Sequence, residues 1–386
     1  MNILNSILKI FRFVIILISG FIGVLLLFIG IQYATCPIYN FPDPEPFQGS
    51  HWYNPYENLS GEWYKANFHG HSISWFGATD GKDYPDMIFK HYHELGYAIV
   101  ALSNYQHIQN FSTSLFHYPV YEHGYNVSKT HQLALGAHKV VWADYVFGQN
   151  LNHKQHIINT LQKHTELVAL AHPTFQNGYS EKNMKYLSNY NLFEALNHYR
   201  FSLTLWDTLL ANGKIAWIIG DDDTHNINDP RQTGVRWNMI NSNSLKPDDV
   251  WAALKDGHCY AVAGKNGRLD NQLKSLHIQN NKLMLACQQQ ALKIIFIGNK
   301  GDTLNTFSNT ANADFALGAR DHYVRTEIFS HESTIYLNPV IRFDGHEIES
   351  ASASVNHLAT WIQRSGILLL LCLIVVGLRR IKSGGF

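Results

Sequence analysis

Two long apolar runs stand at the ends of the chain, and they constrain its architecture more than any other feature. The segment from Phe13 to Ala34 contains no charged residue, and a helix needs about 20 apolar residues to cross a bilayer. The uncharged run from Gly366 to Leu378 reaches a similar length if it extends back through Leu358, with Arg364 at the interface. The sequence therefore predicts one transmembrane helix at each end of a large extramembrane region.

The charges beside these runs predict their orientation. Lys9 and Arg12 precede the first run, and Arg379, Arg380 and Lys382 follow the second. Because cytoplasmic flanks carry an excess of basic residues, both termini are expected in the cytoplasm, with the region between them on the far side of the membrane. A cleaved signal peptide is the main alternative, although its apolar core usually spans only about 7–15 residues. A lipoprotein-type cleavage site before Cys36 is a minor alternative.

Composition excludes several classes of protein. The 386 residues include 30 basic and 30 acidic side chains, so no overall field favours nucleic acid. A charged fraction of 16% and a hydrophobic fraction of 46% exclude a mostly disordered chain. The 4 cysteines form no C-x-x-C pair, which argues against a disulfide scaffold or a zinc knuckle. The 22 histidines are the anomaly, and they require a chemical explanation.

The middle of the chain has the pattern of an α/β fold. Short apolar runs alternate with segments of helical spacing, the runs being 64–68, 98–102, 167–171, 192–195 and 215–219 and the helical segments 84–95, 153–164, 181–187, 202–210 and 247–254. This alternation predicts a parallel sheet covered by helices, either open or closed into a barrel. After residue 264, short runs separated by turn clusters predict a small antiparallel sheet or sandwich.

Histidine and aspartate follow three of the predicted strands. His69 and His71 flank a glycine after the first strand, His172 follows a later one, and an Asp221-Asp222-Asp223 run leads to His225. The carboxyl ends of strands in an α/β barrel open on one face, so these segments are expected to meet in one pocket. Imidazole and carboxylate groups are metal ligands, and the sequence therefore predicts a shared metal site.

The order H-x-H, D-G, H-P and D-x-H along the chain resembles the PHP (polymerase and histidinol phosphatase) family of metal-dependent phosphoesterases. The resemblance implies a distorted (β/α)7 TIM-like barrel over residues 62–264. Residues 1–35 then form the N-terminal anchor, 36–61 a linker, 265–350 the small β domain, and 351–386 the C-terminal anchor and tail. The metal ligands implied are His69, His71, Asp80, His172, Asp223 and His225.

Two departures from the family pattern alter the expected metal content. Ser103-Asn104-Tyr105 stands where the family has T-D-H, and His138 stands where the matching phrase would place a bridging glutamate. An amide and a phenol bind divalent metals poorly, and one imidazole cannot bridge two ions. We therefore expect one or two divalent ions (Zn, Mn or Fe), with His138 among their ligands.

These residues favour a membrane-anchored, extracytoplasmic phosphoesterase in a bacterial inner (plasma) membrane, in which His225 and Asp223 are catalytic. Its partner would be a phosphorylated small molecule or an envelope component. Glu194 and Asn197 are expected to line the pocket, and Arg325 to reach over its mouth towards a phosphate. A degenerate barrel that binds without turnover, and a scaffold stabilised by metal, are the alternatives. The sequence leaves the substrate and the oligomeric state open.

Overall fold

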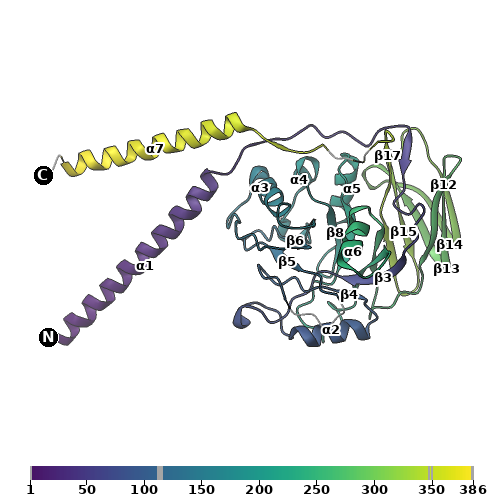
Figure 1. Cartoon of the computed structure of the whole chain (residues 1–386), viewed down its shortest axis with the longest axis horizontal. Helices are drawn as coiled ribbons and strands as arrows, with labels where there is room; N and C mark the ends of the chain where they lie inside the picture. The colour runs from purple at the N-terminus through teal and green to yellow at the C-terminus, as the bar shows by residue number, and fades with distance from the viewer. Residues whose placement is uncertain (1, 111–115, 347, 349–350, 384–386) are drawn as a thin grey trace.

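A computed structural model describes residues 2–110, 116–346, 348 and 351–383. Two long helices, α1 (Asn2–Ala34) and α7 (His357–Ser383), project from the same side of the main body (Figure 1). Within them, the 30 residues Asn5–Ala34 and the 21 residues His357–Gly377 are long and apolar enough to cross a membrane, by length and composition. Both predicted apolar helices are therefore present, while their orientation stays a prediction.

The two ends of the main body are tied together where these helices begin and end. Strand β1 (Tyr39–Asn40) pairs antiparallel with β18 (Ser354–Val355). Beside this pair, Gln363 Nε2 donates to the carbonyl oxygen of Ala34 at 2.6 Å, and Arg364 Nη2 donates to that of Thr35 at 2.7 Å. Arg364 thus satisfies the carboxyl end of α1.

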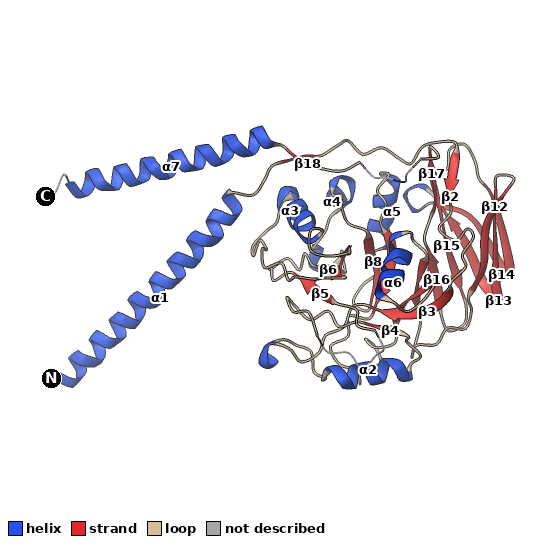
Figure 2. Cartoon of the chain, in the orientation of Figure 1, coloured by secondary structure: helices blue, strands red, loops and turns tan. Residues whose placement is uncertain are grey.

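One sheet contains five strands in the order β5-β6-β7-β8-β9. Only its last three strands are mutually parallel, because β5, β6 and β7 form an antiparallel meander. Helices α3, α4 and α5 accompany this sheet (Figure 2). The bounds are β5 (Val120–His123), β6 (Gln132–Leu135), β7 (Leu167–Leu170), β8 (Leu192–Asn197), β9 (Trp217–Asp221), α3 (Leu151–Leu161), α4 (Glu181–Tyr186) and α5 (Leu203–Ala211).

The second sheet contains eleven strands, with the main path β12-β13-β15-β16-β11-β10-β3-β4. Strand β14 adds to β13, and β17 joins β15 to β2. The pairings are antiparallel except for β3 with β4. The bounds are β2 (His51–Tyr53), β3 (Glu62–Asn67), β4 (Ile99–Val100), β10 (Arg236–Ser242), β11 (Cys259–Ala263), β12 (Leu273–Gln279), β13 (Lys282–Ile297), β14 (Thr303–Ala316), β15 (Tyr323–Phe329), β16 (Thr334–Leu337) and β17 (Val340–Phe343).

The predicted (β/α)7 barrel is not confirmed, since the described strands do not close into one. The two sheets meet at single bridges instead, one between Gly70 and Thr224 and one between Tyr105 and Glu122. A closed barrel of this type needs parallel strands linked by helices, whereas β3 in this chain pairs antiparallel with β10, which pairs antiparallel with β11. The mixed α/β class and the antiparallel C-terminal strands agree with the prediction.

The strands after residue 264 continue the sheet of the first region. Strand β16 pairs with β11, so a single sheet crosses the predicted boundary between 264 and 265. The division into two domains therefore stays a prediction about folding units. The periodicity also missed β14, whose polar sequence looks like turns; its side chains are mostly exposed, and it pairs only with β13.

The remaining helical segments include two longer helices and three short turns, of which two are η2 (Phe175–Asn177) and η3 (Asn299–Gly301). Helix α2 (Pro85–Glu94) begins with proline at its first position and buries Ile88, Phe89 and Tyr92. Helix α6 (Pro247–Lys255) also begins with proline, and it has Asp248 and Asp249 in its first turn. The short η1 (Trp75–Gly77) follows the H-x-H segment. The core around these elements is dominated by buried aliphatic and aromatic side chains.

Candidate metal centre

Extensions of two strands bring the H-x-H segment and the aspartate run together. Beyond the end of β3, the His71 amide donates to the Thr224 carbonyl at 2.8 Å. The Asp223 amide in turn donates to the His69 carbonyl at 2.9 Å. Asp223 is held in the left-handed backbone region, with φ at 49°, which is uncommon outside glycine and concentrates at functional sites. The backbone thus aims both imidazoles and one carboxylate at the same point.

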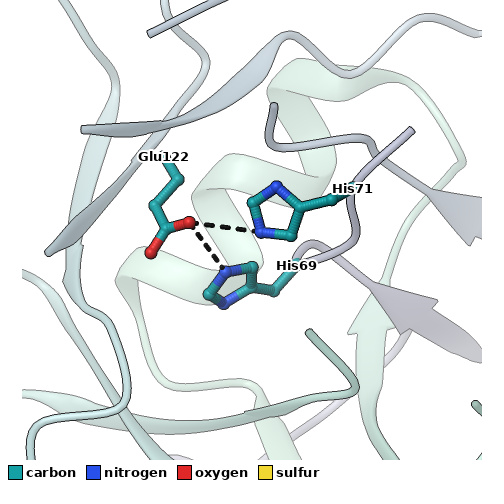
Figure 3. A group of neighbouring side chains, drawn as sticks. All are labelled: His69, His71 and Glu122. Carbon is teal, nitrogen blue, oxygen red and sulfur yellow. Dashed lines mark ion pairs between the residues drawn. The ribbon is translucent and has the colours of Figure 1, made fainter. Parts of the chain in front are cut away.

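Four buried atoms converge at this point. His69 Nε2 lies 3.4 Å from Glu122 Oε2 and 3.2 Å from Asp223 Oδ1. His71 Nε2 lies 3.2 Å from each of the same two oxygens. Figure 3 shows both imidazoles turned towards the Glu122 carboxylate. We call His69, His71, Glu122 and Asp223 the first ligand group.

These four atoms fit a metal ion better than they fit one another. None of them has a hydrogen-bond partner, although all four are buried, and buried polar atoms are normally paired. Four nitrogen or oxygen donors about 2.0–2.1 Å from a tetrahedral ion lie about 3.3–3.4 Å apart. The four separations between an imidazole nitrogen and a carboxylate oxygen of the group are 3.2–3.4 Å. The first ligand group therefore has the donor types of a divalent metal site, and across these four pairs it has the spacing.

A second group uses the other oxygen of Glu122. Glu122 Oε1 lies 2.9 Å from His172 Nε2 and 2.5 Å from His131 Nδ1. The three residues are buried, and their candidate ligand atoms lie within 4.8 Å of one another. His172, like Asp223, has a positive φ, at 28°. Both contacts of Glu122 Oε1 are hydrogen bonds, so these atoms already have partners. One carboxylate thus faces two sets of imidazoles, one set without hydrogen-bond partners and one set hydrogen-bonded to it.

Glu122 takes the place that the sequence analysis gave to His138. His138 is exposed, and its ring packs against His164, with centroids 5.4 Å apart, so it lies outside both ligand groups. The G-x-E phrase was matched to residues 136–138, which directly follow β6 at the start of its connection to α3. The carboxylate that faces both groups of imidazoles lies instead on β5, a strand in which every residue is buried.

Glu194 and Asn197 lie behind the ligands, not at an open pocket wall. Glu194 Oε1 accepts from His69 Nδ1 at 2.8 Å, which leaves His69 Nε2 for the metal. Asn197 Nδ2 donates to Glu194 Oε2 at 3.3 Å and to Asp223 Oδ2 at 3.2 Å. Both side chains are fully buried. They therefore orient ligands, as carboxylates behind metal-binding histidines commonly do, in place of the predicted contact with substrate.

The three consecutive aspartates have different roles. Asp222 accepts backbone hydrogen bonds from Gly234, Val235 and Arg236 and anchors the loop after β9. Burial raises the pKa of Asp222 to about 6 despite these bonds. Asp221 Oδ1 accepts from the Phe68 amide at 2.7 Å. Only Asp223 reaches the ligand atoms.

The rim of the centre contains His225, Asp80 and Tyr105. His225 Nε2 lies 3.3 Å from Asp80 Oδ1 and 3.3 Å from the Tyr105 hydroxyl. The Asp80 side chain is 66% exposed, so it faces solvent, while His225 is nearly buried. The Tyr105 ring stacks on His71 with centroids 4.4 Å apart. Among the predicted ligands, His225 groups with His71 and Asp223, whereas Asp80 contacts His225 at the surface.

Mutual electrostatics keep the carboxylates ionised. Burial alone would raise the pKa of Asp223, but His69 and His71 hold it well below its usual range. Burial also opposes ionisation of Glu122, yet His131 and His69 lower its pKa overall. Conversely, burial would lower the pKa of His69, but Asp223, Glu194 and Glu122 raise it well above its usual value. When no metal ion is bound, a proton on His69 balances part of the negative charge of these carboxylates.

Arg325 does not reach over the site as predicted. Its Nε and Nη2 donate to the two carboxylate oxygens of Asp207 at 2.7 and 2.8 Å, and its Nη1 donates to Glu327 at 2.6 Å. Asp207 lies on α5 and Arg325 on β15. The buried guanidinium therefore joins the five-stranded sheet's helix layer to the large sheet and has no nitrogen left for a phosphate.

Sequence reasoning missed two members of the centre, Glu122 and His131. Both lie in the segment between residues 102 and 153, where no strand was predicted and where β5 and β6 are found. The sequence contains no clear signal here, because Val120–His123 reads Val-Tyr-Glu-His and has no apolar run, although the structure buries all four residues, where an unpaired charge is costly. Among the predicted ligands, the structure brings His69, His71, His172, Asp223 and His225 together.

Comparison with known proteins found a structural resemblance but no match by sequence. No family model matches the sequence, and no curated protein matches it. A solved structure that resembles it is a two-domain protein from Bacteroides vulgatus ATCC 8482, described as containing a predicted PHP-like metal-dependent phosphoesterase. The TM-score is 0.43 and the identity 12%, over 78% of this chain and 100% of that chain. The chemistry of the centre must therefore be argued from its own geometry.

Proposed function

We propose that this chain is a metal-dependent phosphoesterase anchored to a membrane, with its metal centre outside the cytoplasm. The observation that carries the proposal is the convergence of four buried atoms without hydrogen-bond partners, from His69, His71, Glu122 and Asp223. Mixed imidazole and carboxylate donors suit Zn, Mn or Fe. The two ligand groups around Glu122 support one or two such ions.

The donor set also suits the chemistry of a phosphoester. His69, His71, Glu122 and Asp223 would hold one divalent ion, and Glu122, His131 and His172 a second. A divalent ion bound there supplies acidity to water and neutralises charge on phosphate oxygens. Because Asp223 stays ionised, we assign it the role of ligand and not of proton carrier. His225 Nε2, between Asp80 and Tyr105 at the rim, is the group placed to hold or move a proton.

The membrane placement rests on the two terminal helices. Their apolar side chains are almost entirely exposed, which is unfavourable in water unless a bilayer or another apolar surface covers them. The basic residues that flank α1 and α7 on their outer ends favour cytoplasmic termini. The substrate would then be a phosphorylated small molecule or an envelope component.

The test combines metal content with hydrolysis on one set of full-length samples. Wild type, Asp223→Asn and His138→Ala are purified in detergent, and metals are counted by elemental mass spectrometry. Hydrolysis of bis-p-nitrophenyl phosphate is measured on the same samples. We expect Asp223→Asn to lose at least one metal equivalent and about 100-fold or more in rate, since metal catalysis is worth several kcal/mol. His138→Ala is the matched histidine control and should retain both.

Two results would count against the proposal. Wild type without metal after growth in Zn, Mn and Fe would remove the metal centre. Metal that is lost in Asp223→Asn, without hydrolysis of mono- or diester substrates by wild type, would favour a barrel-like body that binds metal without turnover.

A further inference from the structure

A row of exposed aromatic side chains connects the end of α1 to the metal centre. The exposed members are Trp75, Phe76, Tyr125, Trp142 and Phe147, which we call the aromatic face. Their exposures range from 42% for Trp75 to 110% for Phe76. Contiguous exposed apolar surface of this kind usually marks a contact with a partner or a membrane.

The aromatic face begins at the last turn of α1. The Phe147 amide donates to the Tyr33 hydroxyl at 2.7 Å, and the Tyr33 ring packs on Tyr145 with centroids 5.1 Å apart. Tyr33 lies at the end of the apolar segment Asn5–Ala34, which is the level where tyrosine sits at a membrane–water interface. Phe147 therefore stands at the level of the headgroups if α1 spans a bilayer.

From there the aromatic face continues to the mouth of the centre. The Tyr125 hydroxyl donates to the Trp142 carbonyl at 2.7 Å, and the Trp142 ring meets the Trp75 ring edge-on at 5.8 Å. Trp75 Nε1 then donates to the carbonyl of Tyr105 at 2.7 Å. Asp144 links the two parts of the face, since its carboxylate accepts from the amides of Tyr125 and Tyr145, both at 2.8 Å. Since the Tyr105 ring stacks on His71, a series of contacts through Asp144 runs from the end of α1 to a proposed metal ligand.

The backbone turn at Trp75 and Phe76 holds both side chains at the protein surface. Trp75 and Phe76 have φ values of 52° and 56°, a left-handed conformation that is uncommon for bulky residues. This turn leaves the Phe76 ring fully exposed. Elements β5, β6 and α3 lie on the side of the body nearest to α1, and β12–β14 on the opposite side (Figure 1). The apolar exposure is thus concentrated beside the helix that reaches into a membrane.

We propose that the aromatic face rests in the headgroup region of the bilayer spanned by α1, so that the metal centre acts on phosphoesters of lipid-like molecules at that surface. The substrate part rests on the proposed phosphoesterase function, whereas the contact with the bilayer does not. Tryptophan and tyrosine favour the interfacial region, and direct continuity with the end of α1 makes the bilayer the occupant of this face.

The contact is tested by a nitroxide at position 76, introduced as Phe76→Cys in full-length protein in phosphatidylethanolamine–phosphatidylglycerol vesicles. The control is Leu292→Cys on β13, which is also exposed, at 41%, but lies on the opposite side. Both variants carry Cys372→Ser, since the other cysteines are buried. We expect position 76 to be shielded from aqueous chromium oxalate and accessible to oxygen, and position 292 to show the reverse. Equal access to chromium oxalate at both positions would overturn the proposal.

The substrate class is tested by comparing phosphatidic acid in those vesicles with soluble bis-p-nitrophenyl phosphate. Phe76→Ser/Phe147→Ser should slow hydrolysis of the lipid about tenfold, because interfacial binding weakens. Hydrolysis of the soluble ester should stay within about twofold, as should both rates in Leu292→Ser. Equal losses on both substrates would overturn the proposal. Wild type that hydrolyses the soluble ester but no phosphatidic acid would overturn the substrate class, and shielding at position 76 without any hydrolysis would refute only the phosphoesterase function.

Discussion

Two buried polar clusters in this molecule have opposite hydrogen-bond balances. Each of the three guanidinium nitrogens of Arg325 donates a hydrogen bond to a carboxylate. Asp207 accepts two of these bonds and Glu327 accepts one. At the first ligand group, by contrast, His69 Nε2, His71 Nε2 and Asp223 Oδ1 are buried without hydrogen-bond partners. Of the two Glu122 oxygens, only Oε1 is hydrogen-bonded, to His131 and His172. Both clusters contain acidic and basic groups, and both are nearly inaccessible to solvent.

The difference separates a structural cluster from one built around a ligand. A buried ion pair whose charged groups hydrogen-bond to each other needs no ligand, and it can join two layers of a fold. Buried donors and acceptors that point at a common position cost free energy unless an additional group satisfies them. At the candidate metal centre, a positive ion would satisfy these atoms. It would also offset the negative charge of the buried carboxylates Glu122, Glu194 and Asp223.

The largest expected effect is on the free energy of unfolding, when the cluster around Arg325 is broken. Arg325→Met would leave Asp207 buried beside Glu327 without a cation, and breaking a buried pair costs about 3–5 kcal/mol. We expect the free energy of unfolding, measured by denaturant titration of the protein in detergent, to fall by about this amount while metal content per folded chain is retained. The double variant Arg325→Met/Asp207→Leu should recover part of the loss. A loss of metal in folded Arg325→Met would show that the two clusters are not independent.

Chelation should have the next largest effect, and it should act only through the metal centre. A ligand at 100 times its dissociation constant stabilises the folded state by about 2.7 kcal/mol. EDTA should therefore lower the thermal midpoint of wild type and of Arg325→Met by similar amounts, and that of Asp223→Asn by much less. An equal shift in Asp223→Asn would assign the stabilising metal to another site.

The stabilisation by metal should also grow with pH. In the metal-free protein, carboxylates raise the pKa of His69 above its unfolded value, so its contribution is fully present below about pH 6.5 and is lost as pH rises through the raised folded pKa. Metal binding requires neutral imidazole and releases protons. The gap between the thermal midpoints of loaded and chelated protein should widen from pH 5.5 to 8.5. A gap that narrows with pH would mean that histidines are not the ligands.

A smaller effect is expected behind the ligands. Glu194→Gln keeps the size of the side chain but weakens the hold on His69 Nδ1, and such partners are commonly worth 10–100-fold in metal affinity, or about 1.4–2.7 kcal/mol. Competition with a chromophoric chelator measures the change. Direct loss of all metal in Glu194→Gln would instead place Glu194 among the ligands.

The smallest effect is expected at His138, which is exposed and packs only on His164 in the described structure. His138→Ala should change stability by no more than about 0.5 kcal/mol, and it should leave metal content unchanged. Elemental mass spectrometry on the purified variant checks whether His138 lies outside the metal centre.

Sequence reasoning located candidate ligands that follow a short predicted strand. His172 and Asp223 follow the buried strands β7 and β9, and His69 and His71 follow β3, which is buried only at its last two residues. It failed where the ligand lies within a strand, as Glu122 does, or where the strand is polar and exposed, as β14 is. It also could not distinguish Asp223 from Asp221 and Asp222, since their roles depend on backbone amides contributed by distant segments.

The pairing of β1 with β18 sets an order of events during biosynthesis. Tyr39 is among the earliest extramembrane residues to be made, and its partner Val355 is among the last. At about 5–20 residues per second, roughly 15–60 s separate the two. Strand β1 must wait through this interval while both sheets assemble. The two-residue ladder is therefore a late step of folding, which closes the chain only after everything between its ends has been synthesised.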